Sequence, residues 1–270
     1  MVKLKLWQVD AFAEKALEGN PAAIVPLDHW TDASLMQKIA NENNLAETAF
    51  FVKTAAGKYD LRWFTPEAEV DLCGHATLAS AYTIFNDLDP SLSRVDFETR
   101  SGTLTVEKKD GRLVMSLPAD PVAPFDAPAG FAKAIGDALG TAPPSEIYKG
   151  RYILAVWDSA KGVRGIEGPG DIGSVLRKHG VWGLIATAAG DEGFDFISRF
   201  FAPDKGVPED PVTGSAHCAL VPFWAKRLNK KTLKARQVSP RGGNLLCTDD
   251  GARTVLSGNC ALYMRGQIEI

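Results

Sequence analysis

Glu47 lies in the stretch NENNLAETAFFVK, where a helical pattern gives way to the alternation of a strand. On that strand Glu47 shares a face with Ala49 and Phe51, and the residues between them point to the opposite face. A carboxyl group beside apolar side chains has its pKa raised by loss of hydration, which suits a general acid or base. We therefore predict an acid/base role for Glu47, although the spacing also allows a surface glutamate at a strand edge.

Two short segments are expected to open helices and to offer backbone N–H groups to a ligand. The first N–H groups of a helix have no partner within the helix, and they carry a partial positive charge. Glycine at such a turn lets a ligand approach the backbone closely. Two turns that face one another would form a seat for a carboxylate and for an enolate-like oxyanion. The predicted substrate-binding residues of the two turns are Cys73, Gly74, Ala76, Thr213, Gly214 and Ala216.

Several side chains at these turns also have plainer structural interpretations, which the sequence leaves open. Asp210, which precedes Pro211, would line the same cleft, but it could equally be a helix cap. His75 could be a hydrogen-bonded core histidine, and Ser215 could bond locally within the first helical turn. Cys73 could simply be a small buried residue.

A metal site made of Cys73, His75, His217 and Cys218 is conceivable, but the spacing argues against it. His217 and Cys218 are adjacent on a predicted helix, so their side chains point about 100° apart. No pair among the four residues has the spacing common in zinc sites. We therefore predict no metal.

The chain contains an internal repeat that indicates a duplicated fold. RWFTP at 62–66 corresponds to RFFAP at 199–203, and each is followed by an acidic loop and a glycine turn. The distance along the chain from the phenylalanine two residues before the proline to the glycine of the turn is three residues longer in the second repeat, as a loop insertion would make it. The runs at 75–85 and 215–225 carry no Lys, Arg, Asp or Glu, which predicts helices enclosed by protein, the second kinked at Pro222.

The segments around these helices have the patterns of strands and hairpins. Period-two alternation and Asp-Gly or Ser-Gly turns predict antiparallel strands near 61–66, 95–118 and 146–157. Helical patterns appear at 32–43 and 130–139, and the Pro- and Ala-rich stretch 118–130 is the predicted linker. We predict an α+β chain with one domain over 1–117 and a second over 118–259. A final strand at about 260–270 is expected to return to the first domain.

Composition places the chain among soluble globular proteins and excludes several functions. The 270 residues are 45% hydrophobic and 23% charged, with a net charge of −3. This balance lacks the broad basic excess of nucleic-acid-binding proteins, and no apolar run is long enough to span a membrane. The N-terminus lacks the apolar core of a signal peptide, and the four cysteines show no CxxC pair. A cytoplasmic protein with reduced thiols is expected.

Four motifs in register resemble the PhzF family of phenazine-biosynthesis-like isomerases, and the resemblance covers both halves of the chain. The motifs are GNPAAIV, NLAETAF, FTPEAEVDLCGHATLASAY and EDPVTGSAHC. The resemblance implies the diaminopimelate-epimerase fold, in which two pseudo-symmetric domains each roll a mixed, mostly antiparallel sheet around a central helix. It implies an active site between the domains, no cofactor, and a homodimer. It also implies that Glu47 moves a proton of a small carboxylated metabolite, while His75, Asp210 and Ser215 orient the substrate and the proton network.

One departure from related enzymes narrows the chemistry. Amino-acid epimerases of this fold resemble two-thiol enzymes, with a cysteine at each turn. This chain has Cys73 at the first turn but Thr213 at the second, and a hydroxyl is too weak an acid to replace a thiol near neutral pH. We therefore predict a one-base isomerase. Two alternatives remain open: a carboxylate-binding protein without turnover, and an epimerase that uses Cys73 with a carboxylate partner.

Overall fold

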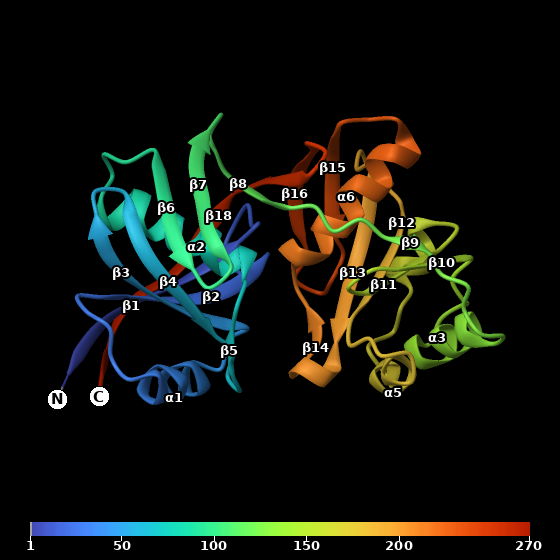
Figure 1. The fold of residues 1–270 in the computed structure, drawn as a ribbon, viewed down its shortest axis with the longest axis horizontal. Helices are drawn as coiled ribbons and strands as arrows, with labels where there is room; N and C mark the ends of the chain where they lie inside the picture. Colours follow the sequence, from blue (N-terminus) through green and yellow to red (C-terminus); the bar gives the residue numbers. More distant parts are fainter. Residues whose placement is uncertain (1) are drawn as a thin grey trace. The chain divides into compact units, whose positions relative to one another are not determined.

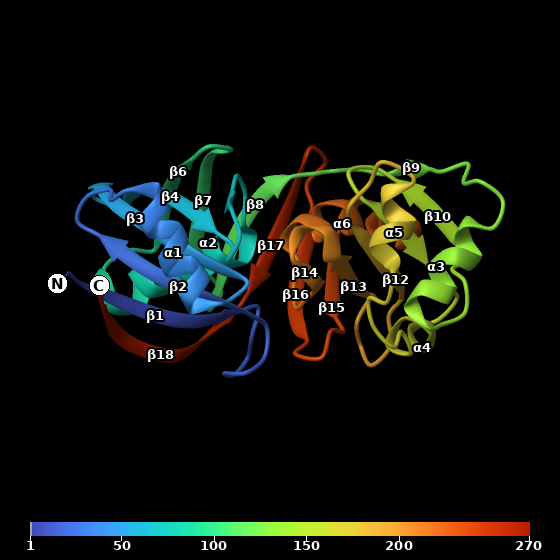
Figure 2. The ribbon, with the colours of Figure 1, turned by 90° about the horizontal axis from the view of Figure 1, so that it is seen from below.

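The computed structural model describes residues 2–270 and divides them into two compact units (Figures 1 and 2). The first unit contains the chain up to Leu117 together with Leu256–Ile270, and the second contains Pro118–Val255. None of the helices in the described part of the chain combines the length and apolar character needed to cross a membrane.

The first unit is built mainly from one curved sheet. Its elements are β1 (Lys3–Ala11), β2 (Asn20–Leu27), α1 (Ala33–Asn43), β3 (Glu47–Ala55), β4 (Lys58–Phe64), β5 (Glu69–Val70), α2 (Gly74–Thr83), a π-helical turn (Ile84–Leu88), β6 (Arg94–Thr99), β7 (Gly102–Lys109), β8 (Arg112–Pro118) and β18 (Cys260–Glu269). The strands pair in the order β18-β1-β2-β3-β4-β6-β7-β8. Only β2–β3 and β4–β6 are parallel, because a helix connects each of these pairs.

The second unit repeats this order of elements. Its elements are β9 (Ala123–Pro124), α3 (Phe131–Leu139), β10 (Glu146–Lys149), β11 (Ile153–Val156), α4 (Ala160–Arg164), α5 (Ile172–Arg177), β12 (Leu184–Ala189), β13 (Phe196–Ala202), a 3₁₀ turn (Pro203–Lys205), β14 (Val207–Asp210), α6 (Gly214–Leu228), β15 (Thr232–Gln237), β16 (Gly243–Asp249) and β17 (Arg253–Gly258), which runs past the unit boundary. The strands pair in the order β9-β10-β11-β12-β13-β15-β16. The parallel pairs β11–β12 and β13–β15 stand where β2–β3 and β4–β6 stand in the first unit. The duplicated fold predicted from the sequence is therefore confirmed.

Each unit encloses one helix within its sheet. α2 contacts β1, β2, β3, β7 and β18, and all but one of its ten residues are buried. α6 packs on β15 and β16, and its Trp224 stacks on Phe196 of β13. The uncharged runs of the sequence are thus the central helices of the two units, as predicted. α6 continues through Pro222 to Leu228.

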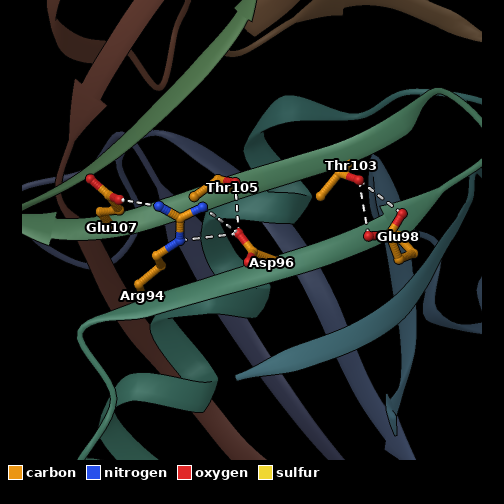
Figure 3. A network of polar contacts seen from close by, with 6 residues as sticks. All are labelled: Arg94, Asp96, Glu98, Thr103, Thr105 and Glu107. Atoms are coloured by element: carbon orange, nitrogen blue, oxygen red, sulfur yellow. Dashed lines mark hydrogen bonds and ion pairs between the residues drawn. The ribbon is translucent and has the colours of Figure 1, made fainter. Parts of the chain in front are cut away.

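The two faces of the β6–β7 hairpin show why the alternation of apolar and polar residues in the sequence predicted strands here. Val95, Phe97, Leu104 and Val106 point inward and are almost fully buried. Figure 3 shows the opposite, polar face, where Arg94 contacts both Asp96 and the cross-strand Glu107. The other labelled contacts of this face join Thr105 to Asp96 and Thr103 to Glu98. Such cross-strand pairs fix the register of the hairpin.

The linker predicted at 118–130 is not a free connection. β9 lies within it and pairs with β10, and Phe125 packs edge-on against Phe131 of α3. The whole stretch belongs to the second unit. Its Pro and Ala content marks an irregular edge of that unit, because proline is tolerated at sheet edges. The helices predicted at 32–43 and 130–139 are confirmed as α1 and α3.

Candidate active site

The first glycine turn forms the buried start of α2. Cys73 is the N-cap residue, with an extended backbone (φ −142°), and the helix begins at Gly74. The Thr77 hydroxyl donates to the Cys73 carbonyl at 2.6 Å, which ties the turn to the helix one turn later. Gly74 and Ala76 are buried with this turn, so the first N–H groups of α2 lie in a setting of little water.

Glu47 opens β3 beside this turn. Its side chain is only 15% exposed, and its Oε2 lies 3.0 Å from Nε2 of His75. The strand register places Glu47 next to Ala22 of β2. Phe50, on the other face of β3, belongs to the core cluster that includes Met36 and Ile39 of α1. Glu47 is therefore not a surface residue at a strand edge.

His75 is held by three side chains. Asn20 places its amide Nδ2 3.1 Å from Nδ1 of the imidazole, and Cys73 places its sulfur 3.5 Å from the same nitrogen. Glu47 contacts the other nitrogen. Burial alone would lower the pKa of His75, but the neighbouring Cys73 and Glu47 more than offset this and raise it well above its ordinary value. His75 thus lies between the Glu47 carboxyl group and the Cys73 sulfur, and both contacts favour its protonated form.

Cys73 is a poor nucleophile in this setting. Burial, together with the charge of Glu47, raises the pKa of its thiol to about 11. The side chain therefore carries its proton near neutral pH, and the thiolate is the reactive form of cysteine.

Gly19 explains how Asn20 reaches His75. Its backbone has φ +65°, and a Cβ at this position would lie 2.2 Å from the carbonyl oxygen of Ala11. Only glycine fits there without displacing β1. The turn brings the chain into β2 at Asn20, a fully buried residue.

The second glycine turn, at the start of α6, is held by a different set of side chains. Thr213 is the N-cap residue, and its hydroxyl donates to Oδ2 of Asp210 at 2.5 Å. Gln237, at the end of β15, accepts from the Thr213 N–H at 2.9 Å and donates to the Asp210 carbonyl at 2.6 Å. Ser239 donates to the Pro211 carbonyl at 2.8 Å. Asp210 therefore is not the helix cap, because it lies before the capping residue and accepts from it.

Ser215 occupies the position in the second unit that His75 occupies in the first. Its hydroxyl lies 3.0 Å from that of Tyr152, which precedes β11. Asn20, the residue that contacts His75, opens β2, and β2 and β11 are corresponding strands. In both units a residue at the start of this corresponding strand, or just before it, thus contacts the side chain that follows the glycine. Gly214 and Ala216 are buried in the same first turn of α6.

His217 and Cys218 are core residues of α6. The His217 Nδ1–H donates to the Thr213 carbonyl at 2.8 Å, and burial lowers the pKa of this histidine to about 4. The Cys218 thiol points to the Gly214 carbonyl, and burial raises its pKa to about 12. Both side chains bond back to their own helix. The residues whose donor atoms do converge, within 4.8 Å of one another, are Glu47, Cys73 and His75.

Comparison with known proteins decides the family. The model of the PhzC-PhzF family, described as phenazine biosynthesis-like protein, matches residues 9–266. The chain belongs to this family. An uncharacterized isomerase of Pseudomonas aeruginosa is 45% identical over 269 residues and aligns over the full length of both chains. The crystal structure of a PhzF-family protein of Enterococcus faecalis is 41% identical, covers both chains completely and superposes with a TM-score of 0.91.

A more distant structure shows how far the fold extends beyond the PhzC-PhzF family. A hydroxyproline epimerase of Agrobacterium vitis superposes with a TM-score of 0.63 at 10% identity, covering 98% of this chain and 92% of its own. At that identity the likeness concerns the fold alone. The predicted epimerase-like fold is thereby confirmed.

Three supporting residues of the site were missed by sequence reasoning. Asn20 lies in the GNPAAIV motif, which was noticed without a role being given to the asparagine. Tyr152 and Gln237 lie 63 and 24 residues from the partners that they hold. Their contacts follow from strand register, and no local pattern encodes register between distant strands.

Proposed function

We propose that this chain is an isomerase that moves a proton within a small carboxylated metabolite without a cofactor. The pair formed by Glu47 and His75, 3.0 Å apart and mostly buried at the start of α2, is the observation that carries the proposal. Relatives named as isomerases, one of them 45% identical over its full length, support the reaction class.

Glu47 is the proposed acid/base. Its carboxylate takes a proton from an acidic carbon of the substrate and returns it to another atom on the same face. His75, whose pKa is raised, lies with its Nε2 3.0 Å from Oε2 of Glu47 and is proposed to hold that side chain in place. The N–H groups of Gly74 and His75 at the start of α2 are proposed to stabilise the negative charge that develops on the substrate.

Asp210 and Ser215 are proposed to orient the substrate and to complete the proton network. Both are positioned by residues of the second unit, Asp210 through Thr213 and Gln237 and Ser215 through Tyr152. The first residue of β12, the strand that corresponds to β3, is the buried Leu184. A single carboxylate at a strand start fits a one-base reaction better than a symmetric two-base reaction.

The position of Cys73 also argues for one base. Two-base epimerisation needs proton donors on opposite faces of the reacting carbon. Donor atoms of Cys73 and Glu47 lie within 4.8 Å of each other, too close to flank a substrate from both sides. With a pKa of about 11, the Cys73 thiol is protonated near neutral pH and is not available as a general base.

The test is proton exchange with solvent. Small carboxylic acids that raise the melting temperature of the chain are incubated with it in D₂O, and deuterium incorporation is followed by mass spectrometry. Glu47→Gln should lower the exchange rate by at least about 100-fold, as expected for loss of a general base. Glu42→Gln is the matched control, because Glu42 is an exposed residue of α1 that undergoes the same chemical change.

Two results would count against the proposal. Exchange that is as fast in Glu47→Gln as in the unmodified chain would remove Glu47 from the reaction. Acids that bind tightly but acquire no deuterium and form no product would favour a carboxylate-binding protein without turnover.

A further inference from the structure

Three donor atoms of different chemistry converge at the start of α2. They are the sulfur of Cys73, an imidazole nitrogen of His75 and a carboxylate oxygen of Glu47, all within 4.8 Å of one another. Nε2 of His75 lies 3.0 Å from Oε2 of Glu47 and 4.0 Å from the sulfur. Thiolate, imidazole and carboxylate are the three ligand types that Zn²⁺ takes in proteins.

The separations are close to those of ligands on one metal ion. In a tetrahedral zinc site with bonds of about 2.0 Å to nitrogen or oxygen and about 2.3 Å to sulfur, ligand atoms lie roughly 3.3 to 3.6 Å apart. The distances from Nε2 of His75 to Oε2 of Glu47 and to the Cys73 sulfur, 3.0 and 4.0 Å, each differ from this range by a few tenths of an ångström.

The Glu47 carboxylate has an oxygen available for such an ion. Oε2 is buried and makes no hydrogen bond of good geometry, although Nε2 of His75 is only 3.0 Å away. A buried oxygen without a hydrogen bond is unfavourable unless another positive group satisfies it. The two atoms lie side by side, as two ligands of a shared cation do.

The surroundings match a metal site in charge and in support. Binding of Zn²⁺ releases the protons of the Cys73 thiol and of the His75 ring nitrogen to solvent. Zn²⁺ with the resulting thiolate, a carboxylate and a neutral imidazole has no net charge, so the ion would not leave an unbalanced charge among these buried side chains. Asn20 holds the other ring nitrogen of His75, and the Ala76 backbone bonds to the Cys73 sulfur. Contacts of this kind orient ligands in established sites.

We propose that Glu47, Cys73 and His75 bind a thiophilic divalent cation of the Zn²⁺ type, leaving one coordination position open. The bound ion uses the carboxylate that the proposed isomerase reaction needs, so binding and proton transfer exclude each other. The binding itself needs no substrate, and its measurement is therefore independent of whether the chain is an isomerase.

The test uses Co²⁺ as a spectroscopic probe and Zn²⁺ as a competitor, with the tag-free, chelator-treated chain. We expect one Co²⁺ per chain, a sulfur-to-cobalt charge-transfer band with the visible bands of tetrahedral Co²⁺, and loss of both on adding Zn²⁺. Cys73→Ser should abolish the charge-transfer band. Glu47→Gln should weaken binding by at least about 10-fold, the lower end of what loss of even a supporting contact does.

Cys218→Ser is the matched control, because Cys218 is another buried thiol near the start of a central helix. It should leave the spectrum unchanged. Absence of Co²⁺ binding, or a charge-transfer band that survives in Cys73→Ser, would overturn the proposal. Thermal melting checks that each variant is folded. If Cys73→Ser does not fold, the affinity of Glu47→Gln for Co²⁺ still tests the proposal.

Discussion

At the residue scale, the two histidines near the helix starts have pKa values shifted in opposite directions. His75 has carboxylate and thiol neighbours that raise its pKa, whereas His217 has only its own helix carbonyl and a pKa lowered by burial to about 4. The residue type is the same, and the neighbours decide between a charged site residue and a neutral core residue.

His217 makes the folded chain less stable in acid. Its pKa lies below the unfolded value of 6.5, so only the unfolded chain takes up this proton between about pH 6.5 and pH 4. The contribution of His217 to the free energy of unfolding is therefore fully present above pH 6.5. It falls by about 3 kcal/mol as the pH drops through this window.

The check is urea unfolding of the chain and of His217→Gln at pH 7 and near pH 4. The glutamine does not titrate, so the stability lost between the two pH values should be smaller in the variant by about 3 kcal/mol. Equal losses in the two proteins would show that His217 is not the group responsible.

At the element scale, each glycine turn is a helix start held by a distant strand. Gln237 of β15 joins the backbone on both sides of the turn before α6, with bonds to Thr213 and to the Asp210 carbonyl. The turn thereby places Asp210 without any help from the helix itself.

Gln237→Ala should destabilise the second unit. The substitution leaves the buried Thr213 N–H and the Asp210 carbonyl without this partner, which costs about 1–3 kcal/mol. Gln267→Ala, on an exposed position of β18, is the matched control and should change stability by less than about 0.5 kcal/mol. Urea unfolding of the two variants measures the difference, and an unchanged midpoint for Gln237→Ala would contradict this account of the turn.

The same scale explains what the sequence could predict. The runs at 75–85 and 215–225, which carry no Lys, Arg, Asp or Glu, predicted the central helices, because a helix enclosed by protein needs no polar stripe. The places of the two glycine turns at helix starts and of Glu47 at a strand start could be predicted, because local patterns mark such starts. Asn20, Tyr152 and Gln237 were not found as supports, because their contacts depend on how separate strands align.

At the scale of the whole molecule, the repeat extends to a pair of ion pairs. Arg62 bonds Glu69 through two nitrogens at 2.7 and 2.9 Å, and Arg199 bonds Glu209 in the same way at 2.7 and 2.8 Å. Each pair joins the strand before a glycine turn to the short strand that leads into it. The 3₁₀ turn at Pro203–Lys205 lies within the second, longer connection.

The two ion pairs should contribute differently to stability. The Arg199 side chain is 7% exposed and also donates to the Ile166 carbonyl, whereas Arg62 is 23% exposed and Glu69 has a second partner in Arg100. Arg199→Met should therefore destabilise the chain by about 3–5 kcal/mol, the usual effect of breaking a buried pair, and Arg62→Met by distinctly less. Urea unfolding of the two variants side by side tests this, and equal losses would refute the argument from burial.

The pairing of β18 with β1 affects the order in which the two units complete their folding. β1 pairs along its whole length with Cys260–Glu269, which the ribosome makes only after the entire second unit. The second unit is continuous in the chain and can fold as soon as it leaves the ribosome. Until β18 is made, the backbone N–H and C=O groups along one edge of β1 lack their partner strand. During synthesis, the first unit is thus begun before the second and completed after it, and in that interval the unpaired edge of β1 is open to mispairing with a neighbouring chain.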